Sequence, residues 1–578
     1  MVNEKRMMEC VPNFSEGRNR DVIDAITREV ESTEGVSLLN VDPGEATNRT
    51  VVTFVGEPEA VCEAAFRAVR KAGELIDMRQ HHGAHPRQGA TDVLPLIPIS
   101  GVTLEECAEM ARALARRISD ELLIPTYCYE ASALRPEHRN LATCRAGEYE
   151  ALADKLLDEV KGPDYGRRPM DERIQHTGAT VVGARDFLVA VNFNLNTTST
   201  RRANAIAFDV REKGRPVRDG NPITGPIRRD ADGNPVMRPG TLKATKAIGW
   251  YIDEYGIAQV SMNMTDLNVT PLHIAFDEVS RCAQNRGLRV TGTEIVGLVP
   301  KRVLIDAGRY FLEKQQRSTG IPEQDIIRIA IRSMGLDELR PFNPREKVIE
   351  YLIEDKESSM NNEHLTMNKL IRKTLKDFAE ETSRESPAPG GGTVAAYMGA
   401  LGAALGTMVA NLSAHKAGWD DRWEHFSKYA EQGQVLLREM LRLVDEDTAA
   451  FNALMTAFQM PKKTEAEQAA RLRTIESATL HAAEVPLQTM HAALAVFPLC
   501  KAMAAEGNPA SVSDAGVGAL AARSAVLGAA LNVRINAKTL ADTTKAKALI
   551  AEAQVLCQQA EDHEKEIRNL IDETLGHC

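Results

Sequence analysis

The sequence has few aromatic residues, no zinc-type cysteine motif and no basic run. Phe, Trp and Tyr make up 5% of its 578 residues, and its nine cysteines include no CxxC pair. That spacing excludes the common structural zinc modules. The net charge of −11 and the lack of a basic stretch argue against nucleic acid as a partner. The N-terminal residues MVNEKRMMEC contain no apolar signal core, so we expect a cytoplasmic protein.

Long hydrophobic runs are also scarce, with one exception. Residues 394–412 are almost free of charge and contain the Gly402-xxx-Gly406 spacing that also occurs between transmembrane helices. Ala and Gly drive membrane insertion only weakly, and the rest of this region is strongly charged. We therefore expect a buried central helix and no membrane contact.

The composition that is present, 43% apolar and 26% charged residues, is typical of a soluble globular protein, and the length fits three or four domains. Residues 8–180 alternate strand-like and helix-like segments in the order β-α-β-β-α-β, and residues 187–300 repeat this order. Such a split βαβ order predicts two α+β ferredoxin-like subdomains. Residues 211–243 are rich in Gly, Pro, Arg and Asp and predict a long mobile loop in the second subdomain.

From about Asn368 the strand pattern disappears, and apolar residues recur with helical spacing. This predicts an all-α antiparallel helical bundle, in which Pro486 should kink or split the helix over 465–496. We therefore expect a multidomain protein with subdomains at 1–185 and 186–335, a linker at 336–367 and a helical domain at 368–578. Because each half carries a distinctive polar patch, the pairing indicates two consecutive steps on one substrate.

The candidate for proton transfer in the first half is His85, which follows His81 and His82 in a Gly-containing stretch before a strand-like run. An imidazole in a loop at a sheet edge can face a cleft, and its pKa near neutrality suits general acid–base catalysis. A lone histidine beside Pro86 would be an ordinary turn residue. Three histidines in five residues, followed by Arg87 and Asp92, leave the two interpretations evenly balanced.

Asp42, Asn48 and Arg49 flank a predicted hairpin. Carboxylate, amide and guanidinium groups at one turn suit an amino-acid substrate, and Arg49 could hold a carboxylate through two parallel hydrogen bonds. The simpler interpretation, which these residues taken alone favour, is an Asp-Pro-Gly turn with a solvated arginine.

In the helical half, Asp447 lies on an apolar stripe with i, i+3, i+4 spacing, between Val444 and Phe451. A carboxylate that faces a core must be paired or protonated, because burying it alone is costly. A raised pKa would suit a general acid or base. The structural alternative is an ion pair with a buried cation such as Arg534.

Two glycine-containing turns are weaker candidates. Gly390, Gly391 and Gly392 precede a helix-like segment, where free backbone N–H groups attract anions. No Gly-Lys-Ser/Thr follows, so this turn is not a P-loop. Asp514 follows a second polar turn at 507–509, although helix capping alone would account for it.

Longer motifs resemble a known family. Five motifs resemble those of glutamate formiminotransferase: ECVPNFSEG at 9–17, NRT at 48–50, HPRxGA at 85–90, AGEYEAL at 146–152 and TGATxxGAR at 177–185. Two further motifs resemble those of formiminotetrahydrofolate cyclodeaminase: PGGGTVAA at 389–396 and DxDxxAF at 445–451. The resemblance covers nearly the whole chain in the right order, so the chain is similar to the bifunctional formimidoyltransferase-cyclodeaminases.

The resemblance implies two reactions. The first half would transfer the formimino group from N-formimino-L-glutamate to tetrahydrofolate, with the family's histidine at His85. The second half would cyclise 5-formiminotetrahydrofolate to 5,10-methenyltetrahydrofolate and release ammonia, with the family's acid at Asp447. The setting would be histidine degradation and one-carbon metabolism. We expect tetrahydrofolate to be polyglutamylated, no metal or redox cofactor to be required, and the chain to form a homo-oligomer.

The family's folate-binding segment falls between Gly166 and Gly178. The resemblance thus adds candidate folate contacts at Gly166, Arg167, Arg168, Thr177, Gly178, Gly183 and Arg185. The chain departs from the family pattern at 167–176, which is longer and more basic, and at 211–243, which is extended.

Two alternatives stay open. The same architecture could transfer a formyl group from formylglutamate, with the helical half acting as a methenyltetrahydrofolate cyclohydrolase. A non-catalytic folate-binding scaffold would instead bind folate without turnover, and the presence of both His85 and Asp447 argues against it.

Overall fold

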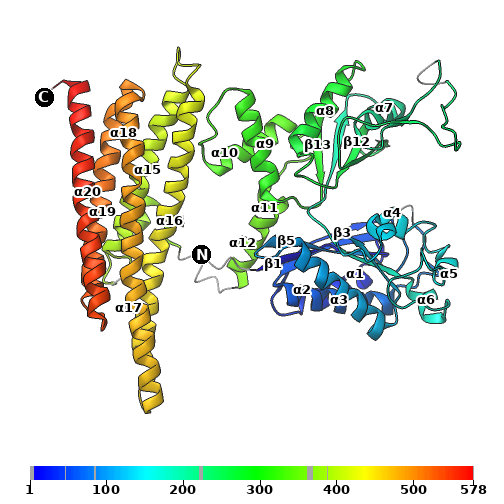
Figure 1. Ribbon diagram of the computed structural model, residues 1–578, viewed down its shortest axis with the longest axis horizontal. Helices are drawn as coiled ribbons and strands as arrows, with labels where there is room; N and C mark the ends of the chain where they lie inside the picture. The colour runs from blue at the N-terminus through cyan, green and yellow to red at the C-terminus, as the bar shows by residue number, and fades with distance from the viewer. Residues whose placement is uncertain are drawn as a thin grey trace. The chain divides into compact units, whose positions relative to one another are not determined.

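The computed structural model describes residues 6–45, 47–83, 86–220, 225–360, 369–386 and 388–576. Contacts divide the chain into two units (Figure 1), Met1–Val303 with Met334–Glu357, and Leu304–Ser333 with Ser358–Cys578. Two larger sheets lie in the first unit, and the described part of the second unit is largely helical. The chain is therefore multidomain, with an α/β N-terminal region and a helical C-terminal region.

The first sheet has seven strands in the order β1-β4-β2-β5-β7-β6, with β3 pairing β4 and β1 also pairing β5. The pairs among β1 to β5 are antiparallel, whereas β5, β7 and β6 run parallel. The strands are β1 (Met7–Cys10), β2 (Asn13–Phe14), β3 (Val36–Gly44), β4 (Arg49–Gly56), β5 (Thr91–Ser100), β6 (Thr126–Glu130) and β7 (Thr180–Ala184).

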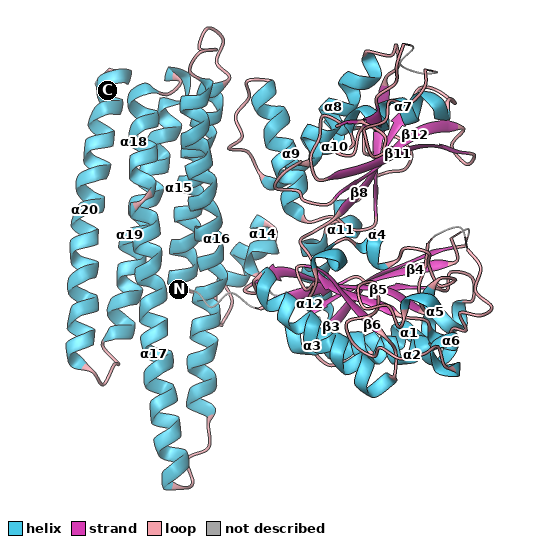
Figure 2. Cartoon of the chain, turned by 45° about the vertical axis from the view of Figure 1, so that its right-hand side comes forward, coloured by secondary structure: helices cyan, strands magenta, loops and turns pink. Residues whose placement is uncertain are grey.

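Helices α1 (Arg20–Glu31), α2 (Pro58–Leu75) and α3 (Leu104–Leu122) lie against one face of this sheet (Figure 2). Their buried sides share one hydrophobic core with β1, β4 and β5. The sequence sets where α3 begins, because Thr103 and Glu106 form a capping box there. Shorter helical turns follow at η1 (Pro136–Arg139), α4 (Leu141–Cys144), α5 (Leu152–Lys155) and α6 (Glu172–Thr177).

The second sheet has four antiparallel strands in the order β11-β12-β8-β13. They are β8 (Val189–Leu195), β11 (Thr245–Ile252), β12 (Ile257–Met264) and β13 (Val290–Val296), joined by α7 (Thr200–Val210) and α8 (Leu272–Gln284). The predicted mobile loop at 211–243 contains paired strands β9 (Arg215–Pro216) and β10 (Met237–Arg238), with further bridges at Arg218–Ile227 and Arg229–Pro235. The loop prediction was therefore wrong for these residues, because short irregular pairing tolerates Gly and Pro.

The segment 336–367, expected to be a linker, begins inside the first unit. It contains α11 (Pro344–Lys347) and α12 (Ile349–Met360), after α9 (Lys301–Lys314) and α10 (Glu323–Met334). Ile349 and Ile353 are buried against Val55 of the first sheet. Apolar burial thus orders the early part of this segment, and its residues 361–367 lie outside the described part of the chain.

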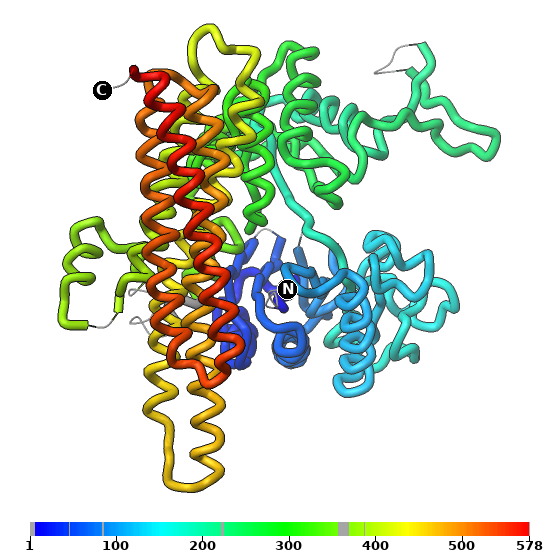
Figure 3. The backbone as a smooth tube through the Cα atoms, turned by 60° about the vertical axis from the view of Figure 1, so that its left-hand side comes forward, coloured from blue at the N-terminus to red at the C-terminus, as the bar shows by residue number. Residues whose placement is uncertain are grey.

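The described helices of the C-terminal region form a bundle of long helices (Figure 3). They are α14 (Leu375–Thr382), α15 (Gly391–Ala414), α16 (Trp423–Gln459), α17 (Glu465–Leu494), α18 (Val496–Glu506), α19 (Val512–Ala537) and α20 (Thr543–Leu575), with turns η2 (Leu370–Arg372) and η3 (Pro509–Ser511). Helix α15 packs closely on α16 and α19. Small residues permit this approach: a Cβ added at Gly402 would stand 2.8 Å from the carbonyl oxygen of Gly518.

Pro486 was expected to kink or split its helix, but the helix is not split: α17 continues through Pro486 to Leu494. A proline cannot donate to the carbonyl four residues earlier, here that of Ala482. The side chain of Asn536, on α19, donates to this carbonyl oxygen at 2.6 Å. A side chain from another helix therefore satisfies the group that the proline leaves free.

Two helices, Gly391–Ala414 and Pro509–Ala537, are long and apolar enough to cross a membrane by length and composition alone. In the most apolar window of the first, 61% of residues are buried within the protein. Packing against α16 and α19 accounts for the apolar composition of that helix.

Candidate functional site

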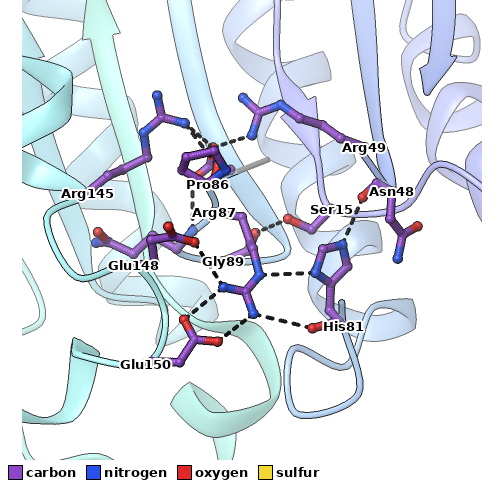
Figure 4. Close-up of polar contacts among 12 residues, drawn as sticks. Ser15, Asn48, Arg49, His81, Pro86, Arg87, Gly89, Arg145, Glu148 and Glu150 are labelled. Carbon is purple, nitrogen blue, oxygen red and sulfur yellow. Dashed lines mark hydrogen bonds and ion pairs between the residues drawn. The ribbon is translucent and has the colours of Figure 1, made fainter. Parts of the chain in front are cut away.

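The loop that carries His85 is held on both sides. His85 itself lies outside the described residues. Before it, Asn48 Nδ2 donates to the carbonyl of His82 at 3.1 Å, and after it, Arg145 Nη1 donates to the carbonyl of Pro86 at 3.3 Å (Figure 4). The described residues on either side of His85 are thus bonded to the hairpin before β4 and to the turn after α4.

A buried carboxylate lies at the base of this loop. Asp92 has no exposed surface, and it pairs with both Arg49 and Arg145, the latter at 2.8 Å. Its second oxygen accepts from the backbone N–H of Gln88 at 2.9 Å, and Arg49 Nε donates to Asn13 Oδ1 at 3.0 Å. Burial lowers the pKa of the Arg49 guanidinium, and Asp92 opposes that effect. Two guanidiniums against one carboxylate leave positive charge that can attract an anionic substrate.

His81, the nearest alternative to His85, is occupied by structural hydrogen bonds (Figure 4). Its Nε2 lies 2.8 Å from the carbonyl of Asn48 and therefore donates to it, and its Nδ1 accepts from Arg87 Nε at 3.3 Å. Arg87 is itself held by Glu150 at 2.7 Å and by Glu148 at 3.2 Å. Burial lowers the pKa of His81, so both ring nitrogens are engaged in a neutral imidazole, and His81 is not available for proton transfer.

The side chains of Asp42 and Asn48 differ in whether they are free to bind a ligand. The β3–β4 register sets Asp42 opposite Val51, on the same face as Arg49. Asp42 is exposed, and its carboxylate has no hydrogen bond or ion pair with another described residue, so it can meet a ligand. Asn48 instead uses both amide atoms in the protein, because its Oδ1 also accepts from Gly17 N at 3.0 Å.

Thr177 and Gly178 lie beside the loop. The carbonyl of Thr177 accepts from Ala90 N at 2.7 Å. A Cβ added at Gly178, whose φ is +66°, would stand 2.3 Å from the carbonyl oxygen of Gln88. Only glycine permits this contact, so this end of the predicted folate segment joins the site.

Gly166, Arg167 and Arg168 lie elsewhere, near the C-terminal end of α3. A Cβ at Gly166 would stand 2.4 Å from Ser119 Oγ, and Arg168 Nη2 donates to the carbonyl of Leu123 at 2.5 Å. Arg167 also donates to a backbone carbonyl, at 3.1 Å. The structure therefore divides the predicted segment into two separate places.

Gly183 and Arg185 belong to the other end of β7. A Cβ at Gly183 would stand 2.3 Å from the ring of Tyr129, and Arg185 donates to the carbonyl of Asp186 at 2.9 Å. Close packing between β6 and β7 explains the glycine. The length of the strand separates these residues from Gly178.

In the second unit, Asp447 on α16 lies against the first turn of α15. Its Oδ2 accepts from the Thr393 hydroxyl at 2.8 Å, and Thr393 also lies 3.2 Å from the Thr448 hydroxyl. A Cβ at Gly392 would stand 2.2 Å from Asp447 Oδ1. The glycine therefore lets the carboxyl group approach the start of the helix.

The electrostatics of Asp447 favour its protonated form. Burial raises its pKa, and the hydrogen bonds from Thr393 only partly oppose this. No described Lys, Arg or His lies within ion-pairing distance of it, and Arg534 is exposed, so the proposed ion pair with Arg534 is not formed. A desolvated carboxyl group without a cation is suited to donate a proton.

The other predicted residues of this half separate into two groups. Gly390 is the N-cap of α15, and a Cβ at Gly391 would stand 3.3 Å from Asn532 Nδ2. Asp514 lies near the start of α19, whereas Asn532 lies near its end, about 27 Å further along the helix. The structure does not bring Asp514 to Asp447.

Several residues of these sites were not assigned a role from the sequence: Arg145, Glu148, Glu150, Thr393 and Asn532. Four of them lie within or beside the motifs at 146–152 and 389–396, but nothing local indicates their partners. Asn532 has no motif signal at all. Among the residues that the structure describes, no group of three His, Cys, Asp or Glu side chains is placed to hold a metal ion.

Comparison with known proteins confirms the family indicated by the motifs. Family models match residues 7–185 (Formiminotransferase domain, N-terminal subdomain), 190–354 (Formiminotransferase domain) and 374–555 (Formiminotransferase-cyclodeaminase). The Formimidoyltransferase-cyclodeaminase of Sus scrofa is 41% identical and aligns over 93% of each chain. The Glutamate formimidoyltransferase of Streptococcus pyogenes is 42% identical over 53% of this chain and 94% of its own. The Methenyltetrahydrofolate cyclohydrolase of Methylorubrum extorquens is 36% identical over 32% of this chain and 90% of its own. Since the match to the Sus scrofa protein spans nearly the whole of both chains, the chain belongs to the formimidoyltransferase-cyclodeaminase family.

Proposed function

We propose that the chain performs both reactions of its family name. It transfers the formimino group from N-formimino-L-glutamate to tetrahydrofolate, and it cyclises 5-formiminotetrahydrofolate to 5,10-methenyltetrahydrofolate with loss of ammonia, in histidine degradation and one-carbon metabolism. The observation that carries this proposal is the family match across both halves of one chain. Two separate constellations, around the loop of His85 and around Asp447, support one reaction each.

In the transfer, N5 of tetrahydrofolate attacks the formimino carbon and the bond from that carbon to the glutamate nitrogen breaks. His85 takes the proton from N5 and returns one to the departing nitrogen. Arg49 and Arg145, which share Asp92, hold a carboxylate of the donor. Asp42 orients the imidazole or the donor, and Asn48 positions the loop through its bond to His82.

In the cyclisation, N10 adds to the formimino carbon, and the N10 proton moves to the imine nitrogen. The resulting amino group must gain one more proton to leave as ammonia. Asp447 supplies it, because burial raises the pKa of its carboxyl group and so favours the protonated form. Gly391 and Gly392 form the first turn of α15, and Gly392 lies against Asp447. Their backbone N–H groups can bind a folate oxygen there.

A formyl donor with a cyclohydrolase step is the second candidate, favoured for the helical unit by its likeness to the Methylorubrum protein. The two functions differ in the leaving group. Formiminoglutamate and formylglutamate, assayed side by side, separate them: we expect ammonia from the first and no turnover of the second. Turnover of formylglutamate without ammonia would establish the second function instead.

We further propose that the chain is a homo-oligomer. Helices α15 and α19 pack side by side, and both expose apolar side chains at helical spacing: Met398, Leu401, Met408 and Leu412 on α15, and Val517, Leu520, Leu531 and Ile535 on α19. A charge-poor surface of this kind is typical of a subunit interface. Light scattering coupled to size exclusion tests it, and a monomer at micromolar concentration would contradict it.

Three finer assignments accompany this proposal. Each larger sheet is built on a ferredoxin-like core, supported by the strand orders β5-β1-β4-β3 and β13-β8-β12-β11. The folate carries a polyglutamate tail near Arg167 and Arg168. The enzyme is cytoplasmic, consistent with the eight described cysteines, all of which are free thiols.

A further inference from the structure

A basic cleft lies on the helix side of the second sheet, formed by α7, the end of α8 and the β9–β10 hairpin. Figure 1 shows α7 and α8 beside the strands of this sheet. The cleft has a volume of about 850 Å³, and none of its lining residues is acidic. It is lined by five arginines: Arg201, Arg202, Arg215, Arg218 and Arg286.

The positive charge of the cleft is not neutralised within the protein. Arg215 and Arg286 share one carboxylate, that of Asp209. Arg201, Arg202 and Arg218 form no ion pair with a described carboxylate. Five guanidiniums and one carboxylate leave a surplus of four positive charges. In a chain of net charge −11, such a local surplus of positive charge attracts an anionic ligand.

Hydrogen-bond donors are also left over. The Nε of Arg286 is buried and has no partner among the described residues. Arg202 and Arg218 each donate to one backbone carbonyl, at 3.1 Å and 2.7 Å, although a guanidinium carries five N–H groups. A bound oxyanion would satisfy several of these donors at once.

A smaller hollow of about 290 Å³ adjoins the cleft, because Phe208, Arg215, Asn285 and Arg286 line both. It adds Arg238 and Arg281. Phe208 supplies an apolar surface between the guanidiniums, and the guanidinium of Arg211 stands over its ring at 4.0 Å. The site thus combines apolar contact with convergent cationic donors, as binding sites for organic anions do.

We propose that this cleft binds a nucleoside di- or triphosphate. A guanidinium fork pairs with a phosphate through two parallel hydrogen bonds, and each phosphate brings about one to two negative charges. Two or three linked phosphates therefore match the surplus of positive charge in the cleft. A volume of about 850 Å³ lies in the range of small-molecule sites.

A polyglutamate tail fits less well. Its carboxylates each carry one charge and are spaced a whole residue apart, so few of them can meet the clustered guanidiniums together. None of the residues lining the cleft belongs to the site around Asp92 or around Asp447. The inference is therefore independent of the proposed function.

The test is a binding titration of the full chain with N-methylanthraniloyl-ATP in EDTA, followed by fluorescence anisotropy. We expect saturable binding that unlabelled ATP displaces and that weakens with added salt. The variant Arg201→Ser/Arg218→Ser should bind about tenfold or more weakly, and since neither residue pairs with a described carboxylate, it should fold like the parent. Arg228→Ser is the matched control, because Arg228 belongs to the same hairpin, is exposed and lines neither hollow.

Three results would overturn the proposal: no saturation in the parent, equal affinity of the double variant, or displacement by pentaglutamyl folate but not by ATP. An equal loss in the Arg228→Ser control would do so as well, since it would show a diffuse charge effect. Because the readout is binding and not turnover, failure here leaves the two-reaction proposal standing.

Discussion

Asp447→Asn is the substitution that separates a catalytic carboxyl group from a structural one. The amide keeps the shape of the side chain, and its oxygen can still accept from the Thr393 hydroxyl, now 2.8 Å from Oδ2. What it loses is the transferable proton. General acid catalysis contributes about 10²- to 10⁴-fold to rates, so ammonia release from 5-formiminotetrahydrofolate should fall by that factor while formimino transfer continues.

The Asp447→Asn substitution should not lower the stability of the protein, as it would if Asp447 anchored a buried ion pair. Removing one partner of a buried ion pair costs about 3–5 kcal/mol, but no described cation pairs with Asp447. Burial raises its pKa, so the parent gains stability from this group below the unfolded pKa and loses it as pH rises through the folded pKa. The asparagine variant lacks that loss and should melt at or slightly above the parent at neutral pH.

The rate of ammonia release should depend on pH in the same direction as the stability contribution of Asp447: both decrease as pH rises. The donor must be protonated, so the parental rate should decrease as pH rises through the raised pKa of Asp447. Asp445→Asn is the matched control: this neighbouring carboxyl also has a raised pKa through burial, but it accepts from the backbone N–H of Leu370 at 2.9 Å. We expect the control to keep the ammonia rate. A folded Asp447→Asn protein that releases ammonia at the parental rate would refute the reasoning.

The remaining predictions concern the transfer site, the folate tail and the bundle. His85→Ala should abolish transfer and spare cyclisation of supplied 5-formiminotetrahydrofolate, and loss of both activities in a folded variant would contradict separate sites. Arg167→Ser/Arg168→Ser should weaken the binding of pentaglutamyl folate more than that of monoglutamyl folate, and the difference in affinity should shrink with added salt. An equal loss of affinity for both folates would place the tail elsewhere. Arg173, the third arginine between Gly166 and Gly178, is left unchanged in that variant because it joins α2 and α3 through the carbonyls of Gly73 and Leu122. Asn536→Ala should lower the free energy of unfolding by about 1–3 kcal/mol, measured by calorimetry. The effect should be smaller in a Pro486→Ala background, where a backbone N–H at position 486 can bond the same carbonyl.

The sequence predicted features that depend on local periodicity. The stripe around Asp447 identified a carboxylate near the core, because side chains at i and i+4 share one helix face. The alternation of strands and helices in the first half and the helical region after it were likewise visible in spacing alone. The glycine turn at 390–392 was recognised, but its reason, the close approach of Asp447 to Gly392, is a tertiary contact.

Features that depend on distant partners were not predictable. Pro486 was expected to kink or split its helix. The helix is not split, and the carbonyl that the proline leaves free accepts from Asn536, fifty residues later. Arg145 joins Asp92 across 53 positions, so neither residue indicates the other. The predicted folate segment divides because a backbone hydrogen bond joins Ala90 to Thr177, whereas Arg168 lies at the end of α3. Chain neighbours thus need not be neighbours in a site.

The central claim is that one chain carries two consecutive reactions on folate. The most direct measurement supplies formiminoglutamate and tetrahydrofolate to the full chain and follows 5,10-methenyltetrahydrofolate and ammonia separately. We expect both products to appear in equal amounts, and we expect the Asp447→Asn protein to accumulate 5-formiminotetrahydrofolate in place of both. Formation of 5,10-methenyltetrahydrofolate without an equal amount of ammonia, or by the Asp447→Asn protein at the parental rate, would contradict it.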